Sequence, residues 1–203
     1  TGGEFVYDGT AHGATVTVST LPAGYRLVTA VSNDTLTDVG SITANCDTLV
    51  IVNAAGEDVT SRLNITKIDG TIKINPAPLT ITTDSAEKVY DGTALTAGGE
   101  ITGFVAGETA TFATTGSQTA VGTSGNTYKL TWDGTAKESN YTISETIGTL
   151  KVTENQAQIT VTTTGGTFVY DGKEHGATVS VSALPTGYTL ETAVSNDKVK
   201  DVA

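Results

Sequence analysis

Short runs of alternating polar and apolar residues recur along the chain and predict β-strands. Residues 14–18, 109–115 and 126–132 alternate with a period of two and are bounded by glycine, asparagine and aspartate. Such runs are typical of half-buried strands, and the abundant threonines favour an extended backbone through their branched β-carbon. Helical spacing of residues extends over no more than single turns, best at residues 57–63 and 136–140. The sequence therefore predicts an all-β fold.

Two long segments of the chain are close copies of each other. Residues 5–39 and 168–202 are identical at 25 of 35 aligned positions. A third copy of their opening begins at Lys88 and places its tyrosine 83 residues after the first one and 80 residues before the last one. The closing segments, residues 64–75 and 141–153, also correspond. Self-similarity at this period indicates a tandem array of structural repeats.

The alignment divides the chain into three repeats, covering residues 1–77, 78–154 and 155–203. Compared with the second repeat, the first begins without a leading strand and the third covers only the first half of a unit. We expect six or seven strands in a complete unit, packed as an immunoglobulin-like β-sandwich, with a β-grasp-like sheet as the alternative. Each repeat should fold around its own core and contact only neighbouring repeats of the same chain.

Charge and hydropathy exclude several classes of partner. The chain has 22 acidic and 11 basic side chains and a net charge of −11, which disfavours binding to nucleic acids and to anionic lipid surfaces. No apolar run approaches the roughly 20 residues of a membrane-spanning helix, so no membrane insertion is expected. No signal-peptide pattern opens the chain, and any such segment is expected outside this sequence.

Residues able to carry catalysis or bind a metal are few and isolated. Cys46 is the only cysteine, so no disulfide forms within the chain, and we expect it to be a small buried hydrophobic residue. His12 and His175 occupy the same place in the outer repeats. One histidine per repeat provides too few ligands for a metal site, and proton transfer would need a second positioned group within hydrogen-bond reach. We therefore expect no catalytic residue, no cofactor, no metal and no enzymatic activity.

The motif Tyr-Asp-Gly opens each repeat and predicts a tight turn. Aspartate tolerates the left-handed backbone conformation and glycine adopts it without a steric penalty. The tyrosine is expected to pack beside the turn. The nine residues expected to build these turns are Tyr7, Asp8, Gly9, Tyr90, Asp91, Gly92, Tyr170, Asp171 and Gly172.

A second motif, Leu-Pro-Ala-Gly-Tyr or Leu-Pro-Thr-Gly-Tyr, occurs at residues 21–25 and 184–188. Its proline and glycine favour a turn between strands. Tyr25 and Tyr188 are the candidate residues of a binding loop, whose ligand would be a host glycan or an extracellular protein. Trp132 is expected in an aromatic core, with an exposed platform for sugars as the alternative.

Together, the Tyr-Asp-Gly openings, the matching closing hairpins and the restarts of the type Leu-Thr-Ile-Thr resemble the YDG/MBG-type immunoglobulin-like repeats of bacterial surface adhesins and other large cell-wall or secreted proteins. The resemblance spans the whole chain. It implies modules without catalytic residues, located outside the cell on the surface or in the cell wall. Such repeats generally hold a binding domain away from the cell, and some bind host glycans or proteins themselves. Lys88 departs from the pattern of the outer repeats, which have Phe5 and Phe168 at this position.

Three functions remain open at this stage. The chain is a stalk or spacer, a repeat that itself binds a host glycan or protein, or an accessory segment of a secreted polysaccharide-degrading enzyme. Because the first repeat lacks a leading strand, the edge at residues 4–7 is expected to be unpaired. That edge would then be filled by strand addition from a neighbouring chain, or the segment would be disordered.

Overall fold

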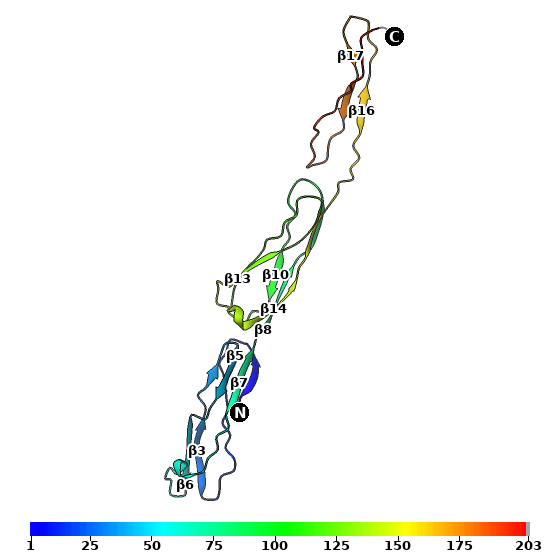
Figure 1. The fold of residues 1–203 in the computed structure, drawn as a ribbon. Helices are drawn as coiled ribbons and strands as arrows, with labels where there is room; N and C mark the ends of the chain where they lie inside the picture. Colours follow the sequence, from blue (N-terminus) through cyan, green and yellow to red (C-terminus); the bar gives the residue numbers. More distant parts are fainter. Residues whose placement is uncertain (202–203) are drawn as a thin grey trace. The chain divides into compact units, whose positions relative to one another are not determined.

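A computed structural model describes residues 1–201, which form a nearly all-β chain (Figure 1). The prediction of an all-β fold is confirmed. Helical structure in this range is limited to two 3-10 turns, Thr60–Arg62 and Glu138–Asn140, within the two segments where the sequence predicted single turns. Residues 202 and 203, the end of the predicted third repeat, lie outside the described residues.

The first repeat is built around a three-stranded mixed sheet. Its strands are β1 (Gly3–Val6), β2 (His12–Gly13), β3 (Tyr25–Val31), β4 (Thr35–Leu36), β5 (Gly40–Ala44), β6 (Thr48–Asn53) and β7 (Gly70–Asn75). Strand β7 is central and pairs in parallel with β1 and antiparallel with β5. Its inward residues Ile72 and Ile74 are buried and alternate with more exposed ones, as expected for a pleated strand. The pairs β2–β4 and β3–β6 form two further sheets.

Two expectations about the first repeat are wrong. Residues 4–7 do not lack a partner in the chain, because β1 pairs with β7 and the Tyr7 amide donates to the Asn75 carbonyl at 2.8 Å. Residues 14–18 were predicted to form a strand and form none. Their alternating pattern is present, but no strand of residues 1–201 pairs with them, and a β-strand depends on a neighbour for its backbone hydrogen bonds.

In the middle repeat, two consecutive strands, β8 and β9, belong to two different sheets. The strands are β8 (Ala77–Thr83), β9 (Ala86–Val89), β10 (Gly99–Thr102), β11 (Thr111–Thr114), β12 (Gly122–Gly125), β13 (Tyr128–Thr131), β14 (Tyr141–Thr146) and β15 (Thr149–Thr153). Strand β8 lies between β10 and β14, and β9 lies at the edge of the sheet β12-β15-β9. Both pair in parallel with the end of the same repeat, β8 with β14 and β9 with β15. Strands β11 and β13 form a separate pair.

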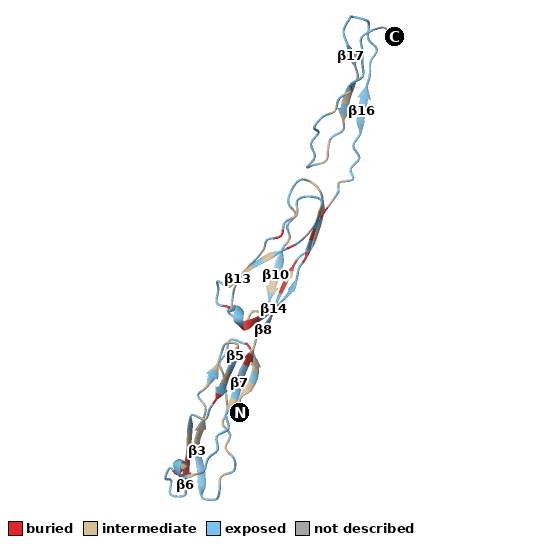
Figure 2. Cartoon of the chain, in the orientation of Figure 1, coloured by how far each residue is buried: buried red, intermediate tan, exposed pale blue. Residues whose placement is uncertain are grey.

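The third repeat contains two small pairs of strands. Strand β16 (Val161–Thr164) pairs with β18 (Thr178–Val181), and β17 (His175–Gly176) pairs with β19 (Lys198–Val199). All four residues of β16 are exposed. Figure 2 shows the buried residues in the first two repeats and none among the described residues of the third.

The chain divides into two compact units whose boundaries differ from the repeat boundaries. Both units take strands from the middle repeat, because β8 and β9 belong to different sheets. The first unit comprises residues 1–82, 100–113 and 129–146, and the second comprises residues 83–99, 114–128 and those from 147 onward. The first two repeats therefore share one compact unit in part, which brings the turns of one repeat close to the loops of the next.

Candidate functional site at the repeat junctions

The Tyr-Asp-Gly motif forms the same tight turn in all three repeats. The φ angles of Gly9, Gly92 and Gly172 are 77°, 79° and 75°, a left-handed conformation that is open to glycine at no steric cost. No other residue type among residues 1–201 has a positive φ. The aspartate of the motif therefore does not share the left-handed conformation that the sequence allowed for it.

Each aspartate instead closes its turn with its side chain. Its Oδ1 atom accepts a hydrogen bond from the backbone amide two residues ahead, which is an Asx turn. The N–O distance is 2.9 Å in each repeat, from Thr10 to Asp8, from Thr93 to Asp91 and from Lys173 to Asp171. The motif thus fixes the backbone that follows the tyrosine.

A histidine supports the turn in the outer repeats. His12 Nε2 lies 3.0 Å from Asp8 Oδ1, and its ring stacks on Phe5 with 4.0 Å between ring centres. His175 makes the same contacts with Asp171 at 2.8 Å and with Phe168 at 4.3 Å. These histidines are parts of a turn.

A lysine takes this role in the middle repeat. Leu95 replaces the histidine, Lys88 replaces the phenylalanine, and Lys88 Nζ lies 2.7 Å from Asp91 Oδ1 and from the Thr93 carbonyl oxygen. The hydrogen bond from Lys88, followed by those from Thr93, lowers the pKa of Asp91 to about 2, because bonds to a carboxylate favour its charged form. Lys88 therefore replaces the histidine as the side chain that bonds to the aspartate of the turn.

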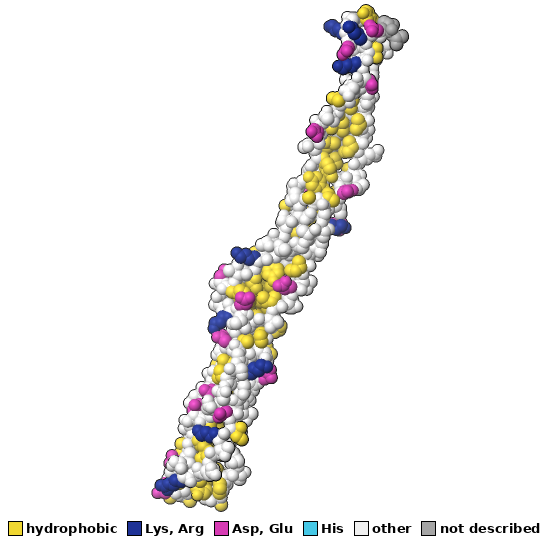
Figure 3. Space-filling model, viewed as in Figure 1, with side chains coloured by type: hydrophobic (Ala, Val, Ile, Leu, Met, Phe, Trp, Pro, Cys, Tyr) yellow, Lys and Arg dark blue, Asp and Glu magenta, His cyan; other side chains and the backbone are white. Residues whose placement is uncertain are grey.

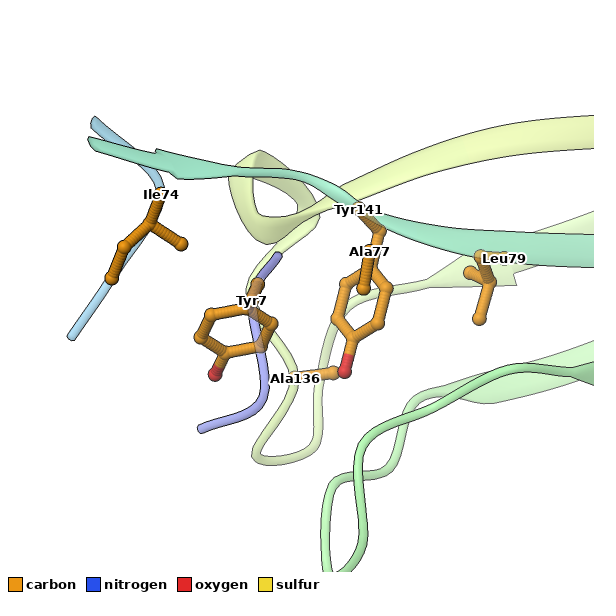
Figure 4. Packing of buried hydrophobic residues seen from close by; sticks show 6 residues of the cluster. All are labelled: Tyr7, Ile74, Ala77, Leu79, Ala136 and Tyr141. Atoms are coloured by element: carbon orange, nitrogen blue, oxygen red, sulfur yellow. The ribbon is translucent and has the colours of Figure 1, made fainter. Parts of the chain in front are cut away.

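Tyr7 packs against the following repeat. It is 6 % exposed and meets Tyr141 of the middle repeat edge to face, with 5.7 Å between ring centres. Both tyrosine hydroxyls donate to the carboxylate of Glu108. Figure 4 shows Tyr7, Ile74 and Ala77 from the first repeat in one cluster with Leu79, Ala136 and Tyr141 of the second. The core therefore crosses the repeat boundary.

A polar contact fastens the same junction at a second point. The backbone amide of Val39 donates to Asn140 Oδ1 at 3.0 Å, and Asn140 Nδ2 donates to Asp38 Oδ1 at 2.9 Å. Asn140 is fully buried, so these bonds satisfy an amide that would otherwise be costly to bury. Lys137 Nζ also lies 2.6 Å from Asp38 Oδ2, but this pair is exposed and contributes little.

Burial at the junction raises the pKa values of Tyr7 and Tyr141. Burial, followed by the hydrogen bond to the Glu108 carboxylate, raises the pKa of Tyr141 to about 12, and the same two causes raise the pKa of Tyr7. Both effects favour the neutral phenol, because loss of its proton would place two negative charges side by side away from water. The neutral phenols are therefore part of what holds the junction together.

Alkaline titration should open this junction. The unfolded tyrosine ionises near pH 10, so the stabilisation is complete below pH 10 and is lost as the pH rises through about 12. A shift of two units corresponds to roughly 2–3 kcal/mol. Urea unfolding followed between pH 9 and 12 should show this loss in the wild-type chain and a smaller loss in Tyr141→Phe. Equal pH dependence of the two proteins would contradict the assignment.

The second junction uses the corresponding loop. Tyr90 of the middle repeat meets Tyr188 of the third edge to face, with 5.2 Å between ring centres. By alignment, Tyr188 occupies the position of Glu108, and Tyr25 occupies it in the first repeat. The tyrosine of one turn thus contacts the same loop position of the next repeat at both junctions. Tyr25 itself is 37 % exposed.

Gly187 should be required at this second junction. A Cβ atom on Gly187 would lie 2.4 Å from the Asp91 carbonyl carbon, whereas one on Gly24, the equivalent residue, would meet no atom within 4 Å. The two glycines have φ of 87° and 86°, so alanine at either place costs about 1–2 kcal/mol of backbone strain. We expect Gly187→Ala to abolish the nuclear Overhauser contacts between the Tyr90 and Tyr188 rings and Gly24→Ala to preserve them. Their survival in Gly187→Ala would contradict the contact.

Other candidate residues show no ligand-binding arrangement. Among residues 1–201, no group of three or more His, Cys, Asp or Glu side chains is placed to hold a metal ion. Cys46 is half-buried, and its thiol faces the Thr48 carbonyl oxygen at 3.5 Å. Trp132 is half-buried against Phe104 and Tyr141, which places it in the aromatic core. No helix in the described part of the chain is long and apolar enough to span a membrane.

Sequence reasoning missed the residues that join the first repeat to the middle repeat. Glu108 and Asp38 were not singled out as site residues, because neither belongs to a motif that recurs in every repeat. The one available signal was the alignment of Glu108 with Tyr25 and Tyr188.

Comparison with known protein families assigns the middle repeat to a domain family. Residues 79–151 match the model of the MBG domain, YGX type. The middle repeat is an MBG repeat. The match confirms the family resemblance over this part of the chain. Because related units lie on both sides of it, the MBG repeat is one module of a tandem array. No curated protein and no solved structure matches the chain.

Proposed function

We propose that the chain is a non-enzymatic spacer in the stalk of a bacterial surface adhesin, located outside the cell. The observation that carries this proposal is the junction between the first repeat and the MBG repeat. There, Tyr7 and Val39 of one repeat bind Glu108 and Asn140 of the next. A spacer has to keep its repeats from folding back on one another, and buried contacts across a boundary oppose the hinge motion that is otherwise the default between domains.

The linker supports the same role. Strand β7 ends at Asn75 and β8 begins at Ala77, so Pro76 is the only residue between them. Proline restricts its own φ and the conformation of the residue before it. The link is therefore too short and too stiff to act as a flexible tether.

The loop that holds Tyr25 or Tyr188 also supports this proposal. Glu108 and Tyr188 occupy one loop position, and each contacts the tyrosine of a preceding turn. We assign Tyr25 the same role towards a preceding turn, in preference to binding a host glycan or an extracellular protein. A glycan or matrix-protein screen in which the chain binds and Tyr25→Ala does not would favour the binding-module alternative.

Spin labels across the first junction test the spacer function. In a Cys46→Ser background, labels at Ser41 and Thr142 report the distance between the two repeats, and labels at Ser41 and Ser61 report a distance inside the first repeat. All three labelled residues are exposed. We expect equally narrow distance distributions for the two pairs, because the junction holds both repeats together.

The outcome that would overturn the spacer function is a broad distribution for Ser41 and Thr142 beside a narrow one for Ser41 and Ser61. Such a result would mean that the first repeat and the MBG repeat move independently. An Asn140→Ala variant provides the positive control for broadening, because it removes the amide that binds both Asp38 and Val39.

A further inference from the structure

In the MBG repeat the segment by which the chain enters runs parallel to the segment by which it leaves. The entry segment is residues 77–89 and the exit segment is residues 141–153. Strand β8 pairs in parallel with β14, and β9 pairs in parallel with β15. In all ten pairs a residue lies opposite the one 64 positions later in the chain. The two segments therefore keep a single register across two sheets, and we call these pairs the entry-exit ladder.

Two side-chain hydroxyls bridge the corner at which the main-chain pairing is interrupted. Between β8 and β9, Thr83 Oγ1 accepts a hydrogen bond from the Gly148 amide at 2.8 Å, and Ser85 Oγ accepts one from the Thr149 amide at 2.9 Å. Thr83 is only 3 % exposed. Hydrogen bonds between the entry and exit segments therefore continue through the corner.

The inward face of the entry-exit ladder is buried. Its apolar residues are at most 1 % exposed and comprise Leu79, Ile81, Leu150 and Val152. A backbone hydrogen bond that breaks in contact with solvent is replaced by bonds to water at little net cost. Burial hinders this replacement, so it opposes the loss of single pairs from the ladder.

The first repeat has the same arrangement. Strand β1 pairs in parallel with β7, the closing strand of that repeat. The amide of Tyr7 donates to the Asn75 carbonyl at 2.8 Å, and the amide of Tyr90 donates to the Thr153 carbonyl at the same distance. The tyrosine of the Tyr-Asp-Gly motif thus extends the parallel ladder by one bond at the corresponding place in both repeats.

Ion pairs across these ladders contribute little to their strength. Lys151 Nζ lies 3.1 Å from Glu87 Oε1, and Lys73 Nζ lies 2.7 Å from Glu4 Oε1. The partners of each pair are directly opposite in register, but their side chains are about half exposed, and solvent weakens such pairs. Figure 3 shows that acidic and basic side chains are scattered over the visible face. The strength of the ladders therefore depends on the backbone bonds and the buried face.

The direction of the strands decides how tension acts on the repeat. In a parallel ladder the starts of both strands lie together, and so do their ends. The chain enters the MBG repeat at a start, Ala77, and leaves it at an end, Thr153. Tension between these points acts along the strands and loads all pairs together, because the bonds of a parallel ladder are evenly spaced. In an antiparallel pair the entry and exit would be neighbours, and tension would break the bonds one at a time.

We propose that the MBG repeat bears tension along the chain and that the entry-exit ladder is the element that resists it. Strands β8 and β15 are the middle strands of their sheets, so each would have to slide past partners on both edges before the repeat unfolds. This function goes beyond that of a spacer, because a spacer can hold repeats apart and still unfold under a small force. It also does not require a rigid first junction.

Force spectroscopy of the full chain in two pulling directions tests the proposal. In a Cys46→Ser background, handles on Pro76→Cys and Glu154→Cys pull along the strands. Handles on Val89→Cys and Glu154→Cys peel the ladder from one end, because Val89 pairs with Thr153. The three substituted residues that carry handles are exposed. We expect a several-fold higher unfolding force along the strands at the same pulling speed, because forced unfolding depends on the unfolding rate in the direction of pulling. Equal forces in the two directions would overturn the proposal.

A substitution at the corner tests the ladder itself. Thr83→Val removes the hydroxyl that binds the Gly148 amide and keeps a side chain of similar shape. It should lower the unfolding force along the strands and leave the peeling force unchanged, because peeling begins at Val89, before the corner is reached. Thr80→Val, on the exposed side of β8, is the matched control and should change neither force. A Thr83→Val chain that is as strong as the wild type along the strands, or that weakens equally in both directions, would overturn the proposal.

Discussion

Replacement of Glu108 by alanine should destabilise the first junction by about 2–6 kcal/mol. Its carboxylate accepts the hydroxyls of Tyr7 and Tyr141, which are 6 % and 7 % exposed as residues. Loss of the acceptor leaves two buried donors unsatisfied, at a cost of about 1–3 kcal/mol each. Urea unfolding followed by the fluorescence of Trp132 measures the effect, because the sole tryptophan of the chain stacks on Tyr141 with 6.0 Å between ring centres.

A double-mutant cycle separates this effect from a general loss of stability. Glu108→Ala and Tyr7→Phe should be strongly non-additive, because each removes the same hydrogen bond. Glu100→Ala, an exposed carboxylate on β10, should change the free energy of unfolding by less than about 0.5 kcal/mol. If Glu108→Ala behaved like Glu100→Ala, the junction would not depend on the carboxylate.

Replacement of Asn126 by alanine should destabilise the MBG repeat by about 3 kcal/mol. Asn126 is completely buried, and its Nδ2 donates to the carbonyls of Asp84 and Gly98 at 3.0 and 2.9 Å, with Ala97 at 3.3 Å. These bonds hold the corner between β8 and β9 against the loop before β10. Each lost bond costs about 1 kcal/mol.

Hydrogen exchange locates the consequence of losing Asn126. The amide of Asp84, which donates to Gly98, should exchange faster in Asn126→Ala, together with a lower midpoint of urea unfolding. Asn126→Asp should be worse than alanine, because it would bury a negative charge against carbonyl oxygens. The exposed Asn45 provides the control, and its replacement by alanine should leave both measurements unchanged. Unaltered exchange at Asp84 in Asn126→Ala would contradict the role of the side chain.

The prediction of strands succeeded where neighbouring strands exist. Residues 109–115 and 126–132 contain the predicted strands β11 and β13, whereas residues 14–18 have the same alternation and form none. The alternation of side chains is a local property, but pairing requires a second strand. The parallel pairing of β1 with β7 and of β8 with β14 was also not predicted, because period-two alternation carries no information on strand direction.

Within the candidate site, local interactions were predictable and distant ones were not. The turn at Asp91 and Gly92 follows from two adjacent residues, since glycine accepts a positive φ and the aspartate bonds two residues ahead. The partner of Tyr7 could not be inferred in this way. Glu108 lies 101 residues away, and no sequence motif links the two residues. The packing of Trp132 in an aromatic core was predicted, because a lone tryptophan in a strand-rich segment is usually buried.

The amino-acid sequence by itself determined an all-β chain of repeats with a Tyr-Asp-Gly turn at the start of each, because alternation, turn chemistry and self-similarity are all properties of short or repeated segments. Only the tertiary structure decided that the tyrosine of one turn belongs to the core of the next repeat, and that β1 pairs in parallel with β7. Both features depend on which distant segments meet. That choice is made by packing and by the satisfaction of backbone hydrogen bonds over the whole chain.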